Sequence, residues 1–297
     1  MLSPAWRFFT YGDGRANACR SVPVSPEILS QNGRTDGGKD TGMEAPFTVS
    51  PEEAERFSKI CHGILMHGKG GSGIGTLSER TMHAAVKCFL SDNPTRQEVP
   101  VPPYVADVME EDGHIFEVQT QGFWRLAPKL DLFLQDHDVT VVYPYPLERY
   151  TVTLTQQGEV KTPRRKSTRP GRLAAVPEEF YALRSLLSHP RLHLRILLLE
   201  VTDYRMPGTP PGRKRRRAST RVERMPCRLL GDFSPAEPKE LNAFLPDDLP
   251  EVFSAAALAG AAHIPVSVAR TVLTLLHSVG GVERAGKEGR AYLWRKV

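Results

Sequence analysis

Two acidic residues ten positions apart, Asp107 and Glu117, are the first candidates for chemistry in this sequence. They lie in two alternating segments, 104–109 and 114–120, that the pattern predicts to be β-strands of a hairpin. Side chains alternate along a strand, so Glu117 and Gln119 share a face. Carboxylates gathered on one sheet are hard oxygen ligands of the kind that bind Mg²⁺ or Mn²⁺, together with a water and a phosphate oxygen.

The register of this hairpin decides whether the two carboxylates meet. A three-residue loop, 111–113, places Asp107 directly opposite Glu117 and gives Gly113 the positive φ that such loops commonly place last. A two-residue loop, 112–113, separates the carboxylates. The sequence permits both registers. In the first, the like charges raise each pKa unless a cation joins them; in the second, the segment is a hairpin with ordinary surface acids.

The helices predicted on either side of the hairpin carry further polar candidates. Glu79 begins the amphipathic helix 77–91, where it either completes a capping box with Thr76 or supports a metal site, and both interpretations stay open. His83 follows one turn later and is expected on a solvated helix face, although it could contact phosphate. Arg125 and Lys129, four residues apart on a helix predicted over 123–134, could supply positive charge to the hairpin or to DNA, and we take both as candidate DNA contacts.

These elements follow one another as helix, three short strands, helix and strand, which predicts an α/β domain with a mixed sheet. With Asp107, Glu117, Val118 and Gln119 on the hairpin, this order resembles the PD-(D/E)XK nuclease superfamily, which includes Holliday-junction resolvases and many restriction endonucleases. The sequence is also similar to uncharacterised bacterial proteins that share the stretch 73–79 and a C-terminal winged helix.

The resemblance implies an αβββαβ restriction-endonuclease-like core and a metal-dependent DNA nuclease. Asp107, Glu117 and the backbone carbonyl of Val118 would hold Mg²⁺ or Mn²⁺, Gln119 would position the attacking water, and Glu79 would support the site.

The sequence departs from the superfamily pattern at two positions. Ala106 stands where the motif has Pro, and that residue contributes little to the chemistry. Gln119 stands where the motif has Lys, and a neutral amide offers hydrogen bonds without the charge of an ammonium group. The alternative function is therefore a DNA-binding regulator whose nuclease-like domain is catalytically inactive.

The C-terminal segment has the pattern of a winged helix-turn-helix domain, namely helix, turn, helix and basic hairpin. We expect Arg270, on the second helix, and Lys287 and Arg290, on the hairpin, to contact DNA phosphates. A winged helix that binds protein instead is the competing interpretation.

The charge distribution also favours a polyanion as partner. The net charge of the whole chain is only +5, but the stretch 161–228 holds eighteen Lys and Arg against five Asp and Glu, including the basic run 213–217. We expect duplex or branched DNA, and a homodimer if both strands of a duplex are cut. The expected organisation is a disordered leader over 1–50, a nuclease-like core over 51–160, a basic extension of that core over 161–235 and a winged helix over 236–297.

Composition excludes several other classes. With 297 residues and 40% hydrophobic residues the chain can bury a sizeable core, yet it has no apolar run that could span a bilayer and no secretory signal. Its four cysteines form no CxxC pair, so we expect a cytoplasmic protein without disulfides. The glycines of 68–73 match GxGxxG, but no strand precedes them, and a nucleotide-binding enzyme is the weakest hypothesis.

Overall fold

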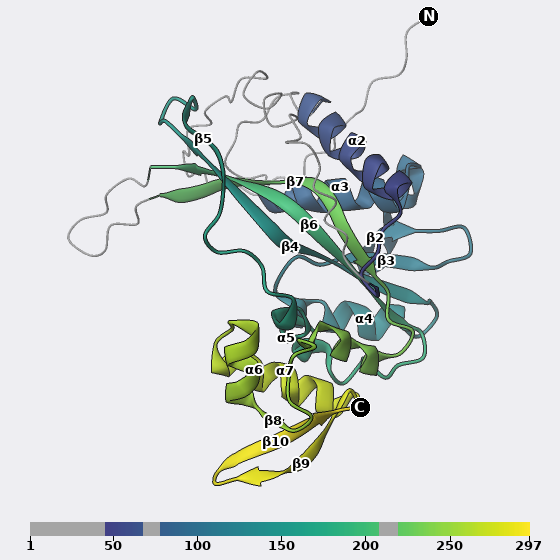
Figure 1. Ribbon diagram of the computed structural model, residues 1–297. Coiled ribbons are helices and arrows are strands. Elements are labelled where there is room, and N and C mark those ends of the chain that lie inside the picture. Colours follow the sequence, from purple (N-terminus) through teal and green to yellow (C-terminus); the bar gives the residue numbers. More distant parts are fainter. Residues whose placement is uncertain (1–44, 68–77, 208–218) are drawn as a thin grey trace, which may run out of the picture.

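The structure, a computed structural model, describes residues 45–67, 78–207 and 219–297. In this part of the chain, seven strands form one mixed sheet with helices on both faces (Figure 1). The strand order is β1-β2-β3-β4-β6-β7, and β5 pairs with β4. The strands are β1 (Gln97–Val101), β2 (Tyr104–Met109), β3 (Ile115–Val118), β4 (Val139–Leu154), β5 (Val160–Lys166), β6 (Leu192–Met206) and β7 (Thr220–Phe233).

The sheet is parallel in its centre and antiparallel on either side. Strand β3 runs parallel to β4, and β4 runs parallel to β6, whereas β1, β2 and β3 form an antiparallel meander and β7 is antiparallel to β6. The helices of this part are α2 (Pro51–His67), α3 (Ser78–Leu90), α4 (Ala127–Phe133) and α5 (Val176–Phe180). The expected α/β class with a mixed sheet is confirmed.

The long strands continue well past the segments that the sequence pattern predicts. A strand was expected only over 139–143, but β4 extends to Leu154, and the Pro-rich stretch after it forms β5. Pro163 is tolerated in β5 because this strand pairs on one side only, with β4. Pro226 lies in β7, the last strand of the order, for the same reason. The basic stretch after residue 160 therefore supplies three strands of the same sheet.

Two hydrophobic clusters hold the layers together. Helices α2 and α3 pack on one face through Phe57, Val86 and Phe89, which meet Leu197 and Leu199 of β6. Helices α4 and α5 lie on the other face, where their apolar side chains share a second cluster with the C-terminal unit (Figure 1).

Part of the predicted leader belongs to the folded protein. Phe47 is buried, with its ring 5.3 Å from that of Phe233 and 4.9 Å from that of Phe244. Ser50 and Glu53 then cap α2, since the N–H of Glu53 donates to Ser50 Oγ at 3.2 Å. Folded structure thus begins before residue 50. Residues 1–44, the glycines of 68–73 and the basic run 213–217 lie outside the described residues.

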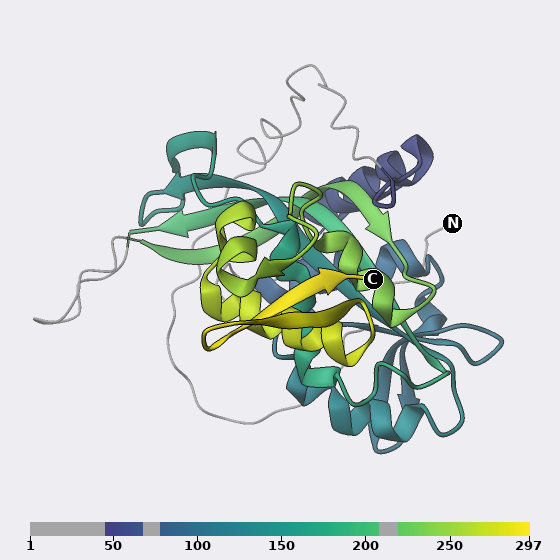
Figure 2. The ribbon, with the colours of Figure 1, turned by 60° about the horizontal axis from the view of Figure 1, so that its bottom comes forward.

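The C-terminal unit combines two helices with a small sheet. Its helices are α6 (Ala255–Ala262) and α7 (Val266–Ser278), and its strands β8 (Phe253–Ser254), β10 (Ala291–Lys296) and β9 (Val282–Glu288) pair in that order. As expected for a helix start, Ser254 Oγ accepts the N–H of Ala257 at 3.2 Å. Figure 2 shows the β9–β10 hairpin at the outer surface of this unit.

No single helix among the described residues has the length and apolar character needed to cross a membrane; α6 and α7 meet that test only as a pair bent by 114°.

Candidate functional site

The turn between β2 and β3 fixes the register in which Asp107 faces Glu117. The N–H of Glu110 donates to His114 O at 2.9 Å, and the N–H of Gly113 donates to Glu110 O at 3.0 Å. Gly113 has φ +86°, so the three-residue loop is the one adopted. Since Val108 pairs with Phe116, Asp107 comes opposite Glu117.

The two carboxylates lie where the ladder between β2 and β3 ends. The backbone N–H of Asp107 donates to Glu117 Oε1 at 3.2 Å, and the N–H of Val118 donates to Asp107 Oδ2 at 2.8 Å. Each side chain thus accepts a backbone hydrogen bond from the opposite strand in place of a carbonyl oxygen. This exchange holds both carboxylates in the gap between the strands.

One basic side chain from each face of the sheet contacts this pair. From α4, Lys129 Nζ donates to Glu117 Oε2 at 2.6 Å, and from α3, His83 Nε2 lies 3.0 Å from Asp107 Oδ2. The side chain of Glu117 is only 3% exposed, whereas those of Asp107 and Lys129 are each 18% exposed. The arrangement is a partly buried pair of carboxylates with a cation beside it.

Electrostatics give the two carboxylates opposite character. Burial and the negative charge of Asp107 raise the pKa of Glu117 to about 7, against the opposing effect of Lys129. Burial also acts to raise the pKa of Asp107, but its contacts with His83 and with the N–H of Val118 outweigh burial and leave that pKa below its ordinary value. Near neutral pH the site therefore holds one firmly ionised carboxylate and one that is close to gaining a proton.

Three further residues were predicted for this site, namely Gln119, Glu79 and Val118. Gln119 follows β3 directly, but its side-chain amide donates to Gln121 O and not to the carboxylates. Glu79 lies in the first turn of α3, and its side chain lies outside the described part of the structure. Val118 is adjacent to Asp107 through its N–H.

Arg125 and Lys129, grouped as equivalent cations in the sequence, are separated by the fold. Arg125 belongs to a short 3-10 turn before α4 and is exposed, with its guanidinium 5.0 Å from the centre of the Trp124 ring. Lys129 alone of the two contacts Glu117.

Sequence reasoning missed the role of His83. It was expected on a solvated helix face, but its imidazole reaches Asp107. The available signal was its position four residues after Glu79, because residues four apart share a helix face.

The donor set suits a hard divalent cation. Two carboxylates from adjacent strands are the number that Mg²⁺ commonly takes from a protein, with waters and substrate phosphates completing its shell. Among the described residues no group of three or more His, Cys, Asp or Glu could hold a metal, so any ion here would rely on those outer ligands.

Two pockets lie near the sheet. The first, which we call the arginine pocket, has a volume of about 370 Å³ and is lined by Arg149, Arg221 and Arg224 together with Glu178 and Glu179 of α5. Its wall also includes Met82, Thr120 and Gln121, which are close in sequence to His83 and Glu117.

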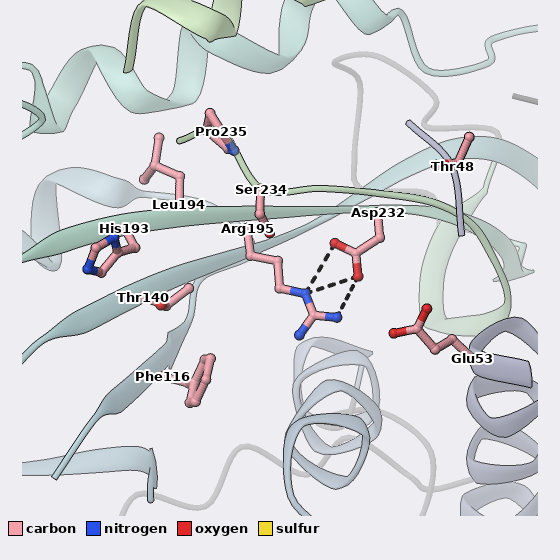
Figure 3. Close-up of a pocket in the computed structure, with 10 residues that line it drawn as sticks. All are labelled: Thr48, Glu53, Phe116, Thr140, His193, Leu194, Arg195, Asp232, Ser234 and Pro235. Atoms are coloured by element: carbon pink, nitrogen blue, oxygen red, sulfur yellow. Dashed lines mark hydrogen bonds and ion pairs between the residues drawn. The ribbon is translucent and has the colours of Figure 1, made fainter. Parts of the chain in front are cut away.

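The second pocket, of about 470 Å³, is formed by residues at the start of β6, at the end of β7 and on α2 (Figure 3). Arg195, which lines this pocket, is already neutralised, because its Nε donates to both carboxylate oxygens of Asp232 at 3.0 and 3.1 Å.

In the C-terminal unit, the predicted DNA contacts all face solvent. Arg270 is exposed on α7, and Lys287 and Arg290 are exposed on the β9–β10 hairpin. The ammonium group of Lys287 lies 4.7 Å from the centre of the Tyr292 ring, and Arg284 lies 4.3 Å from the same centre.

Comparison with known proteins adds a family. Residues 80–234, slightly more than half of the chain, match the model described as "Domain of unknown function (DUF8091)". The chain belongs to this family. The DUF8091 match begins in α3 and ends just after β7, so it contains the whole seven-stranded sheet and the Asp107–Glu117 pair and leaves out the C-terminal unit.

A relative extends the likeness beyond the DUF8091 domain. An uncharacterized protein of Treponema pallidum (strain Nichols) is 32% identical over 224 residues, which is 75% of this chain and 87% of the relative. No solved structure matches the chain significantly.

Proposed function

We propose that the protein is a Mg²⁺- or Mn²⁺-dependent DNA nuclease that hydrolyses phosphodiester bonds. The observation that carries this proposal is the pairing of Asp107 and Glu117 across the end of the β2–β3 ladder, with Lys129 in contact with Glu117. The order α3, three strands, α4, β4 around this pair further supports a PD-(D/E)XK-like core.

Asp107 and Glu117 are the residues that would hold the ion. When bound, a divalent cation supplies Lewis acidity toward the phosphate and lowers the pKa of a coordinated water. To bind the cation, both carboxyl groups must be ionised. Asp107 is ionised at neutral pH because its pKa is lowered, and Glu117 becomes ionised above pH about 7.

The remaining chemistry is assigned to Lys129 and His83. The superfamily motif has a Lys two residues after its Glu, but this chain has Gln119 there, with its amide turned to Gln121 O. We assign the role of that Lys to Lys129, whose ammonium group lies at Glu117 and can stabilise negative charge that develops on the phosphate. His83 holds Asp107 from the other face of the sheet.

We also propose that the C-terminal unit binds DNA as a winged helix. The protein as a whole is proposed to be cytoplasmic. The helices α6 and α7 of the C-terminal unit, followed by the β9–β10 hairpin, are consistent with a winged helix, and Lys287 and Arg290 face solvent on the hairpin. The arrangement suits phosphate contacts, which would position the duplex and make binding dependent on salt.

An inactive nuclease-like DNA-binding regulator remains the second candidate. It is favoured by the fact that Glu117 is nearly fully buried and already ion-paired with Lys129, so that a metal must displace an existing partner. The two candidates differ in cleavage and not in DNA binding.

A cleavage assay separates them. Labelled duplex, single-stranded and four-way-junction DNA would be incubated with Mg²⁺ or Mn²⁺ and the wild type, Glu117→Gln or Lys129→Gln. We expect metal-dependent cuts that fall at least 100-fold in both variants. Glu117→Gln removes an ionised ligand of the cation, and Lys129→Gln removes a group that stabilises developing charge, a loss that costs about 10²–10³ in rate. Binding in a mobility-shift assay should be retained.

Lys59→Gln is the matched control, since it removes an exposed lysine of α2 that pairs with Glu55 and does not touch the carboxylates, and it should cleave like the wild type. Binding without cleavage by any protein on any of these substrates supports the inactive regulator. Cleavage that survives in Glu117→Gln contradicts the assigned site.

A further inference from the structure

The arginine pocket brings together three guanidinium groups, of which only that of Arg224 is ion-paired among the described residues. Arg224 is tied to Asp203, with Nε 2.7 Å from Oδ1 and Nη2 2.9 Å from Oδ2. Arg149 makes one hydrogen bond, from Nε to Pro146 O at 3.1 Å. In the described part of the chain neither Arg149 nor Arg221 forms a salt bridge, unlike Arg195 in the pocket of Figure 3.

These guanidinium groups are held close enough to disfavour each other's charge. Burial, together with the charge of Arg224, lowers the pKa of Arg149 and also that of Arg221. Both stay charged at neutral pH, because an arginine is effectively always protonated. An anion in the pocket would relieve this repulsion, and a phosphate matches the planar fork of donors that an arginine presents.

Two carboxyl groups also line the arginine pocket. Glu178 and Glu179 project from α5, and burial raises the pKa of both carboxyl groups. Carboxyl groups there can accept hydrogen bonds from a sugar hydroxyl or an exocyclic amine. A volume of about 370 Å³ falls at the lower end of the range for small-molecule sites. Guanidinium and carboxyl groups together suit a ligand that carries both a phosphate and a polar ring system.

The pocket lies close to the carboxylate pair along the sheet. Glu117 is level with Val141 on β4, and Tyr143, which lines the pocket, is two residues further on. At about 3.3 Å per residue this is a separation of roughly 7 Å along the strand. Two steps of a nucleic-acid strand, at about 3.4 Å of axial rise each, cover the same length.

We propose that the arginine pocket binds a nucleotide flanking the scissile phosphodiester, with its phosphate on Arg149 and Arg221. The proposal rests on the function proposed above and adds to it a second contact with the substrate strand. Arg224, fixed by Asp203, adds a third guanidinium group to the lining of the pocket. A neutral linkage at the flanking position should therefore be recognised less well than a charged one.

The test uses DNA strands in which a single phosphate is replaced by an uncharged methylphosphonate, moved one position at a time. Binding is measured by fluorescence anisotropy with full-length Glu117→Gln in EDTA, so that no cleavage occurs. We expect one position at which the neutral linkage weakens binding roughly tenfold, as for loss of a charge-assisted hydrogen bond. Adding Arg221→Gln should lower the affinity for unmodified DNA by a similar factor and abolish the effect of that linkage.

Arg165→Gln in the same background is the charge-matched control, because Arg165 is exposed on β5 and does not line the pocket; it should keep the positional effect. The proposal is overturned if Arg221→Gln keeps that effect unchanged. It is also overturned if inorganic phosphate or a nucleoside monophosphate binds in an Arg221-dependent way while DNA does not bind, which would assign the anion to a free phosphate compound. An Arg221-dependent positional effect in a protein that never cleaves DNA would support the pocket and reject only the nuclease activity.

Discussion

At the scale of single residues, the raised pKa of the buried Glu117 makes the stability of the folded protein depend on pH. Its pKa is about 7 in the folded protein and near the ordinary value of 4.5 in the unfolded chain. Between these values the folded state binds the extra proton, so the free energy of unfolding falls as pH rises from about 4.5 to above 7. The total loss is on the order of 3 kcal/mol.

Urea unfolding of the wild type and Glu117→Gln at several pH values measures this effect. The variant lacks the Lys129 ion pair at every pH, but it has no carboxyl group to titrate. Relative to the wild type, we therefore expect it to become progressively more stable between pH 5 and pH 8. Mg²⁺ should stabilise the wild type at pH 8 and not the variant. A difference that stays constant with pH would show that Glu117 titrates normally.

The sequence identified the carboxylates of this site but not their partners. Alternation along two strands placed Asp107 and Glu117 in the right hairpin, and Gly113 was compatible with the observed turn. Nothing local indicated that Lys129 reaches Glu117, because that contact depends on how α4 crosses the sheet. His83 was assigned to solvent for the same reason: a helix pattern shows which residues share a face, and packing decides what that face meets.

At the scale of elements, one glycine determines how the chain after β5 crosses β4. The N–H of Gly171 donates to Leu147 O at 2.7 Å, and a Cβ at this position would lie 2.6 Å from Pro146 O. The two nearest atoms, Pro146 O and Leu147 Cα, belong to the backbone, so they cannot rotate away. Gly171→Ala should therefore destabilise the fold by about 1–3 kcal/mol, as other forms of overpacking do.

Gly260→Ala on α6 is the matched comparison, because a Cβ there meets nothing within 4 Å. We expect this variant to gain about 0.5–1 kcal/mol, the usual preference for Ala over Gly inside a helix. Thermal unfolding of the two variants provides the measurement. Equal effects would mean that the crossing at Gly171 has room to adjust.

Helices and strands were predicted correctly where the hydrophobic pattern of the segment itself defines them. They were not predicted where a strand forms only through its pairing with neighbouring strands. The helix expected over 77–91 forms as α3, and the hairpin strands lie close to their predicted bounds. The strands β5 and β7 were not predicted, and each contains a proline, which is a sign against a central strand. Only the sheet order shows that β5 and β7 pair on one side alone.

At the scale of the whole molecule, much of the positive charge seen in the sequence is used inside the fold. Arg164 pairs with Glu200, Lys166 with Glu148 and Arg224 with Asp203. The excess over 161–228 therefore overstates the charge available to a polyanion. Composition reports net charge but not which cations already have partners, and this is why the arginine pocket could not be found from the sequence.

The charge that remains free on the C-terminal hairpin gives the last prediction. Lys287 and Arg290 are exposed on this hairpin, whereas Arg295 is held by Glu283, with Nη1 3.0 Å from Oε1, and by Glu251. Removing one cation that neutralises a phosphate should reduce the slope of log K against log salt by roughly 0.9 for duplex DNA. We expect Lys287→Gln with Arg290→Gln to lower the slope by up to twice that amount, and Arg295→Gln to change it little. Binding isotherms from 50 to 200 mM salt in EDTA would measure all three proteins. Identical slopes for the wild type and the double variant would mean that the hairpin does not bind DNA, and would favour a C-terminal unit that binds protein instead.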